Sequence, residues 1–196
     1  MHGVDVEDAD LTTPAGNRAV VDAALETYGR LDAIVPNAGF QHVAPVRDFP
    51  EERWDALLAL LLTSPFLLAK YAWDALVAAG DGRICVIASA HALTASANKA
   101  AYVSAKHGVL GLVKTLALEG AGAGISATAV CPAFVRTPLA ERQVEERGLD
   151  AVIERHAVKR LLEPAEVAEV VAFLLGPSGR GFTGVPVALD LGWTAA

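Results

Sequence analysis

The sequence is poor in cysteine and in basic residues, and it has no unbroken apolar run long enough to cross a membrane. Its 196 residues include only two cysteines, Cys85 and Cys131, which stand in separate apolar runs without further ligands at a metal-binding spacing. We therefore expect two buried thiols in a reducing compartment, and neither a disulfide nor a metal site.

The charge balance is acidic, because 16 Lys and Arg stand against 23 Asp and Glu, which gives a formal net charge of −7. Such a chain is a poor partner for a phosphate backbone, so we expect no nucleic-acid binding. The longest apolar stretch, residues 56–69, is interrupted by Thr63, Ser64 and Pro65 and is shorter than the roughly 20 residues of a membrane helix. Residues 1–10 are polar and acidic, unlike a secretory signal. These features predict a cytoplasmic protein without a membrane partner.

Apolar residues make up 53% of the chain, which is enough to bury a core, and the length suits one domain over residues 1–196. Short β-branched runs alternate with longer helical patterns. The expected strands are residues 31–35, 83–88, 125–130 and 184–189. The expected helices are residues 15–28, 49–79, 100–118, 138–155 and 164–175. This order predicts an α/β fold with a doubly wound parallel sheet of the Rossmann type.

Ligands in such sheets lie beyond the carboxyl ends of the strands, and three chemically suited residues stand there or nearby. Ser89 follows the central strand, and Tyr102 and Lys106 share one face of the next helix at positions i and i+4. A phenol has a pKa of about 10, which a neighbouring ammonium lowers. Tyr102 could then exchange a hydroxyl proton while Ser89 holds the oxygen and a nicotinamide takes a hydride. The alternative is an ordinary pair on a helix surface.

These residues resemble the short-chain dehydrogenase/reductase family over nearly the whole chain, with Ser89, Tyr102 and Lys106 matching its catalytic Ser, Tyr and Lys. Asn37-Ala38-Gly39 is similar to the family's N-A-G turn, Asp10-Leu11 to its adenine-contacting pair, and the segment from Pro132 to Thr137 to the part that cups the nicotinamide. The resemblance implies a nicotinamide cofactor, with NAD as our expectation and NADP as the alternative. The cofactor-binding residues that it implies are Asp10, Leu11, Asn37, Ala38, Gly39, Tyr102, Lys106, Pro132, Val135 and Thr137.

Within that family the chain is most similar to 3-hydroxybutyrate dehydrogenases. The positions where that group holds a small carboxylate are occupied here by Gln41, His91, Lys99, Gln143 and Trp193. The resemblance implies interconversion of 3-hydroxybutyrate and acetoacetate. One alternative is another family member, such as a 3-oxoacyl reductase. The other is a non-catalytic remnant of the family that only oligomerises.

Three departures from the family pattern bear on these expectations. No glycine-rich turn precedes Asp10, so the sequence given lacks the first strands and helices of the pattern, and we expect it to bind a dinucleotide weakly. Leu61 stands where the family usually has an Asn that supports proton relay. Ala133 and Leu191 replace two usual glycines near the cofactor.

Two helical segments, residues 57–69 and 103–118, are apolar nearly all round. A helix of this kind must be covered on every side. In the family the corresponding helices build the dimer interface, so the resemblance implies a homo-oligomer, a dimer or a tetramer.

Overall fold

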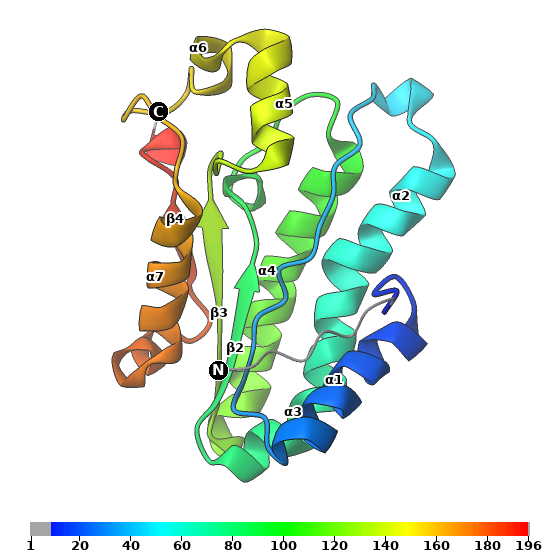
Figure 1. Cartoon of the computed structure of the whole chain (residues 1–196), viewed down its shortest axis with the longest axis vertical. Helices are drawn as coiled ribbons and strands as arrows, with labels where there is room; N and C mark the ends of the chain where they lie inside the picture. Colours follow the sequence, from blue (N-terminus) through cyan, green and yellow to red (C-terminus); the bar gives the residue numbers. More distant parts are fainter. Residues whose placement is uncertain (1–8, 196) are drawn as a thin grey trace.

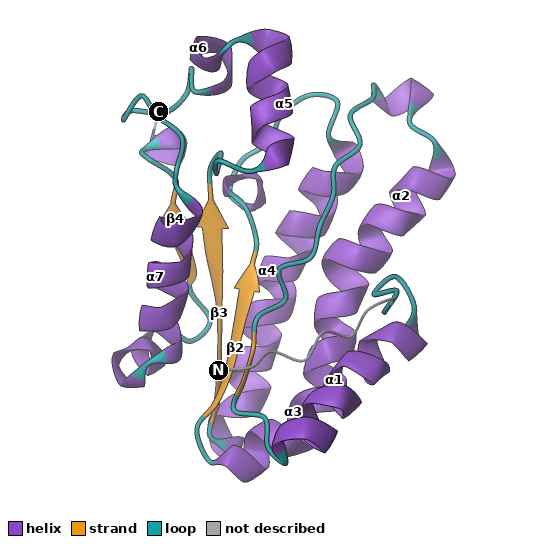
Figure 2. Cartoon of the chain, in the orientation of Figure 1, coloured by secondary structure: helices purple, strands orange, loops and turns teal. Residues whose placement is uncertain are grey.

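Four parallel strands form one sheet in the order β1-β2-β3-β4 (Figure 2). The computed structural model describes residues 9–195. The strands are β1 (Ala33–Ile34), β2 (Gly82–Ile87), β3 (Ile125–Pro132) and β4 (Pro186–Leu189). Because all four run in the same direction, their carboxyl ends meet at one edge of the sheet.

The central position of β2 and β3 agrees with the sequence, whereas β1 is shorter than expected. β3 is buried along its whole length, as β-branched and small apolar residues allow in a sheet covered on both faces. β1 pairs only with β2, through two residues, and Val35 beyond it is 39% exposed. The prediction of a buried strand over residues 31–35 is therefore wrong on both sides of Ala33–Ile34, because among the described residues β1 is paired along one side only.

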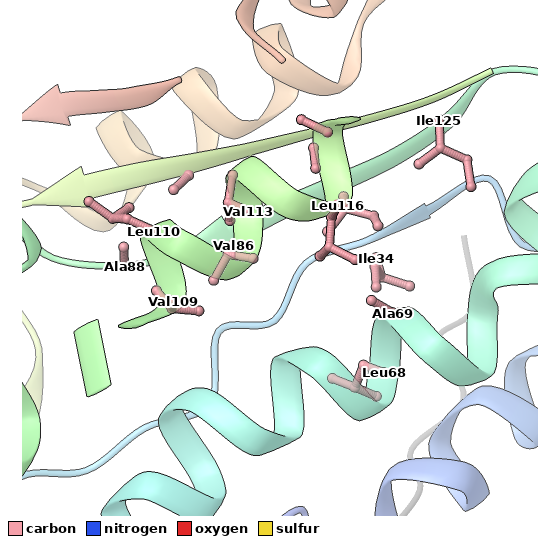
Figure 3. Close-up of a cluster of buried hydrophobic side chains, with 14 of the residues drawn as sticks. Ile34, Leu68, Ala69, Val86, Ala88, Val109, Leu110, Val113, Leu116 and Ile125 are labelled. Carbon is pink, nitrogen blue, oxygen red and sulfur yellow. The ribbon is translucent and has the colours of Figure 1, made fainter. Parts of the chain in front are cut away.

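Helices cover both faces of the sheet, which confirms the doubly wound architecture. On one face α1 (Pro14–Tyr28), α3 (Ser64–Ala79) and α4 (Ala100–Gly120) bury the larger core (Figures 1 and 3). That core includes Leu68 of α3, Val109 and Val113 of α4 and the alternate side chains Ile84 and Val86 of β2. The helix α7 (Pro164–Leu175) packs on the opposite face against Cys85, Val130 and their neighbours. Cys85 and Cys131 are buried free thiols, as predicted.

The segment 51–79 is one long helix with a local change of winding. It comprises α2 (Glu51–Leu58), the π-helical turn Ala59–Thr63 and α3. Pro65 lacks the N–H that would continue the α-helical ladder, and the wider turn before it accommodates that loss. The 29-residue helix is long and apolar enough by length and composition to cross a membrane, so the expectation that the apolar stretch is too short for such a span is wrong. Instead α3 packs on α1 and the sheet as a core helix.

Two short helices follow β3 and lie beyond the carboxyl ends of the strands (Figure 1). They are α5 (Pro138–Arg147) and α6 (Leu149–Val152). Sequence analysis predicts one helical stretch over residues 138–155, but the chain breaks at Gly148, whose φ is +81°. This positive φ, which glycine adopts without steric cost, lets the segment fold back over the sheet edge.

Candidate active site

The turns after all four strands gather the predicted residues at the carboxyl edge of the sheet. Asn37 follows β1, Ser89 follows β2, Ala133 follows β3 and Asp190 follows β4. The carboxylate of Asp190 accepts hydrogen bonds from the backbone N–H groups of Gly192 and Thr194. It therefore stabilises the closing turn, in which Leu191 adopts a φ of +55°. This is the strained conformation that a glycine would relieve.

Ser89 and His91 form one hydrogen-bonded unit at the end of β2. Ser89 Oγ accepts the backbone N–H of His91 at 3.1 Å, and His91 Nε2 lies 3.0 Å from Ser96 Oγ. Both side chains are buried. Burial is the largest cause that lowers the pKa of His91, to about 3, and the charges of Lys99 and Arg155 add to it. His91 is therefore neutral at pH 7 and has a single ring N–H to donate.

Tyr102 and Lys106 enter the same site from α4. Lys106 Nζ donates a hydrogen bond to the backbone oxygen of Ile87 at 2.7 Å and lies 5.7 Å from the centre of the Tyr102 ring. The helix thus fixes both side chains on the face that looks toward the end of β2. The predicted one-turn spacing brings Ser89, Tyr102 and Lys106 together.

The ionisation of this pair differs from the expectation. Burial raises the pKa of Tyr102, and hydrogen bonding with the side chains of Ser89 and Gln41 offsets part of that rise. Burial also lowers the pKa of Lys106, to about 8. The prediction that the neighbouring ammonium of Lys106 lowers the pKa of Tyr102 is therefore wrong, because the loss of solvent raises that pKa.

Leu61 lies on the π-helical turn and is 2% exposed. It packs with Leu57 against Ala101 and Ala105 of α4, next to Tyr102. An apolar side chain can neither accept nor pass a proton. In this chain that position contributes packing beneath the tyrosine.

An inner cavity of about 170 Å³ lies in front of Ser89 and Tyr102. The chain from Pro132 to Thr137 forms its other wall, where Thr137 caps α5 by accepting the backbone N–H of Ala140. The predicted cofactor residues Pro132, Val135 and Thr137 thus face the predicted catalytic pair across one cavity.

A neighbouring groove of about 190 Å³ runs from Lys106 past Asn37 and Ala38 to Leu11. Gly39 follows, and a Cβ there would lie 3.0 Å from Leu61 Cδ2, so a larger residue would require the Leu61 side chain to shift by a few tenths of an ångström. Asp10 is exposed and does not line this groove. Its carboxylate accepts hydrogen bonds from the N–H and hydroxyl of Thr12.

The donors around this groove fit the nicotinamide and ribose part of a dinucleotide. The Lys106 ammonium carries three N–H donors, and among residues 9–195 its one hydrogen-bond acceptor is Ile87. The other two donors suit ribose hydroxyls. The residues that would hold this part of a cofactor are therefore Lys106, Asn37, Ala38 and the wall from Pro132 to Thr137.

A larger outer cavity of about 580 Å³ adjoins the inner one beneath α5 and α6. All five predicted substrate residues line it: Gln41, His91, Lys99, Gln143 and Trp193. Gln41 and Gln143 line both cavities and form the boundary between them. Trp193 is buried, and its ring packs edge-on against His91 with 4.7 Å between the ring centres.

Lys99 is a buried cation without a carboxylate partner in the described part of the chain. Asn98, with a φ of +64°, turns the chain into α4, and Lys99 Nζ lies 5.6 Å from the centre of the Phe134 ring. Burial lowers the pKa of Lys99, and the charge of Arg147 adds to this. A buried ammonium of this kind is a strong site for an anion.

Sequence reasoning assigned no role to two arginines and a serine of this region. Arg147 and Arg155 line the outer cavity, and Ser96 is the hydrogen-bond partner of His91. In the sequence the arginines belong to a charged helical stretch and look like solvated surface. Only the fold, which turns that stretch over the sheet edge, brings them to the cavity.

The chain matches one family model and is similar to several known proteins. A family model described as enoyl-(acyl carrier protein) reductase matches residues 1–194. The chain is 38% identical to a D-beta-hydroxybutyrate dehydrogenase of Cupriavidus necator, over 98% of this chain and 79% of the other. It is also 38% identical to a D-beta-hydroxybutyrate dehydrogenase of Rhizobium meliloti, over 95% and 77%. The crystal structure of gox2181 superposes with a TM-score of 0.91 at 30% identity, over 95% and 74%.

Proposed function

The chain belongs to the short-chain dehydrogenase/reductase family of oxidoreductases, and from that membership we propose that it interconverts 3-hydroxybutyrate and acetoacetate with a nicotinamide cofactor. The observation that carries the proposal is the junction of two cavities. Ser89 and Tyr102 line the inner one, and the buried, carboxylate-free cation Lys99 lines the outer one. A secondary alcohol with a carboxylate two carbons away matches both.

Each side chain of the site has a separate role in the oxidation of the alcohol. Ser89 Oγ and Tyr102 Oη bind the substrate hydroxyl, and Tyr102 accepts its proton as the carbonyl forms. Burial sets the pKa of the resting Tyr102, and the Lys106 ammonium, 5.7 Å from the centre of its ring, favours the phenolate only as charge develops there during proton transfer. The bound nicotinamide supplies the acceptor for the hydride that leaves the carbinol carbon. In the reverse direction Tyr102 returns the proton to the carbonyl oxygen.

The carboxylate of the substrate pairs with Lys99 and accepts hydrogen bonds from Gln41 and Gln143. The amide oxygen of Gln41 is buried without a hydrogen-bond partner in the described part of the chain; as an acceptor it suits a hydroxyl or N–H donor of a ligand, whereas only the amide N–H groups can serve the carboxylate. His91 donates its single N–H or holds Ser89 in place.

We take NAD as the cofactor and the cytoplasm as the compartment, the latter supported by the two buried free thiols.

An assay with paired substrates tests this assignment. We expect D-3-hydroxybutyrate to reduce NAD at saturating dinucleotide, with kcat/KM at least about tenfold higher than that for a 3-hydroxyacyl thioester, which lacks the carboxylate that Lys99 binds. The reverse preference would support the 3-oxoacyl reductase alternative. Absence of turnover with both substrates would favour the non-catalytic alternative.

Lys99→Met should raise the KM for 3-hydroxybutyrate by about 10- to 100-fold and lower kcat less, because the lost interaction is with a group that does not react. Steady-state kinetics at saturating dinucleotide measures both constants. Lys114→Met, at an exposed position of α4, is the matched control and should leave both unchanged. A fall in kcat at constant KM would contradict the carboxylate role of Lys99.

We also propose that the chain forms a homo-oligomer through α4. Leu118 is 82% exposed, Phe66 of α3 is 45% exposed, and a Cβ added at Gly111 would meet nothing within 4 Å. Such an open, apolar helix face suits close packing against a second copy.

The substitution Gly111→Glu tests this interface. A charge at its centre should shift the mass in light scattering from an oligomer to a single chain at micromolar concentration. The helix itself should persist, since Glu is a better helix former than Gly. A monomeric wild type, or an oligomer unaffected by the substitution, would contradict the interface.

A further inference from the structure

The outer cavity carries more positive charge than one carboxylate requires. The chain as a whole has a net charge of −7. Its cavity nevertheless has four cations and two anions in its wall: Lys99, Arg142, Arg147, Arg155, Glu146 and Glu154. A local excess of this sign attracts anions.

Two of these cations, Lys99 and Arg147, repel each other, and a third, Arg155, acts on His91. After burial, the charge of Arg147 is the next cause that lowers the pKa of Lys99, and the charges of Lys99 and Arg155 lower that of His91. Among the residues described, none of Lys99, Arg147 and Arg155 takes part in an ion pair. Bound negative charge relieves the repulsion between Lys99 and Arg147, and Arg155 has no ion-pair partner that would prevent it from taking part.

Arg155 is held in place by contacts that leave its charge available. Its guanidinium carbon lies 4.8 Å from the centre of the Trp193 ring, and Nη2 lies 3.5 Å from Thr94 Oγ1. Trp193 also packs against His91. The Trp193 ring therefore holds Arg155 in the wall of the cavity without neutralising its positive charge.

The volume of the outer cavity also favours a ligand larger than a four-carbon hydroxy acid. About 580 Å³ lies within the range of roughly 300–1,000 Å³ that encloses drug-sized ligands, far more than a four-carbon hydroxy acid fills. With the hydroxyl at Ser89 and Tyr102 and one carboxylate at Lys99, the remaining space borders Arg147 and Arg155.

We propose that the outer cavity contains a second anion subsite, formed by Arg147 and Arg155, and that the enzyme prefers 3-hydroxy diacids to monoacids of equal length. This inference rests on the proposed function, because it assumes that the hydroxyl of a 3-hydroxy acid lies at Ser89 and Tyr102. The distal carboxylate accepts hydrogen bonds from the two guanidinium groups, whose planar donors match its geometry.

A matched pair of ligands tests the subsite: 3-hydroxyadipate ends in a carboxylate where 3-hydroxyhexanoate of the same length ends in a methyl group. We expect isothermal titration and kcat/KM each to favour the diacid by about tenfold, a modest factor because both arginines are exposed. The preference should shrink with added salt. In the double variant Arg147→Gln/Arg155→Gln the diacid-to-monoacid ratio should fall to about one.

The controls separate this proposal from the one on which it rests. Arg53→Gln removes an exposed charge of α2 outside the cavity and should keep the preference. Arg147→Gln alone should lower the ratio without touching Trp193, so a folding defect in the double variant would not decide the result. Equal or better use of the monoacid by the wild type would overturn the second subsite and leave the proposed function standing. Failure to bind or oxidise any 3-hydroxy acid would overturn both.

Discussion

Tyr102→Phe lowers kcat for the oxidation of 3-hydroxybutyrate by about 10³-fold, because the ring remains while the group that accepts the proton is lost. The side chain packs against Leu57, Leu61, Ala101 and Ala105, and phenylalanine preserves those contacts. The loss should therefore fall on kcat, with little change in thermal stability or in KM. Steady-state kinetics at saturating dinucleotide, beside a thermal melt, measures both effects.

Tyr71→Phe is the matched control. Tyr71 lies on α3, where its ring stacks under the guanidinium of Arg18 at 4.1 Å, and it lines neither cavity nor the groove between Lys106 and Leu11. The same loss of a phenolic hydroxyl at that position should leave kcat unchanged. If Tyr102→Phe retained more than about a tenth of wild-type kcat, another group would have to move the proton, and the assignment of Tyr102 would be wrong.

Lys106→Met removes the ammonium that stabilises the phenolate, and kcat should fall by about 10²- to 10³-fold. The same substitution changes how stability depends on pH. In the folded chain the pKa of Lys106 is lowered to about 8 from a reference value of 10.5. Below pH 8 the fold bears the cost of a buried charge. Between pH 8 and about 10.5 the unfolded chain binds the extra proton, so the wild type gains stability as the pH rises.

Across that window the free energy of unfolding of the wild type should rise, relative to that of Lys106→Met, by about 3 kcal/mol, at 1.36 kcal/mol per pKa unit. Urea unfolding of both proteins at pH 7 and pH 10 measures the difference, and the subtraction removes titrations that the two share. Lys114→Met, which loses an exposed ammonium on the same helix, should show no such trend. A constant difference between wild type and Lys106→Met over this range would mean that Lys106 is not buried as described.

Sequence patterns predict the fold where local signals and burial agree. α1 begins after Thr13, which accepts the N–H of Gly16, and ends at Gly29 with a φ of +69°. α7 has the predicted bounds, with a capping box between Glu163 and Glu166. These ends depend on side chains next to the helix itself, so sequence alone contains them. The length of β1 depends on pairing with its neighbour in the sheet, which no local pattern encodes. The break at Gly148 does have a local signal, the glycine itself, which the prediction of one helix over residues 138–155 did not use.

The candidate site is predictable in composition and less so in its electrostatics. One helix turn fixes Tyr102 against Lys106, and parallel strands fix Ser89 at the same edge, so their convergence follows from spacing. The direction in which the pKa of Tyr102 shifts does not follow from spacing, because it depends on how much water the surrounding chain excludes. Arg147 and Arg155 reach the cavity only because α5 and α6 fold over it.

The fate of one hydrogen atom tests the central claim most directly. The protein is incubated with NAD and D-3-hydroxybutyrate that carries deuterium on carbon 3, and the products are examined by mass spectrometry. Direct hydride transfer beside Tyr102 predicts one deuterium in the reduced nicotinamide and none in the water or the acetoacetate. Deuterium released to water, or left in unreacted hydroxy acid with no dinucleotide reduced, would contradict an enzyme of this kind.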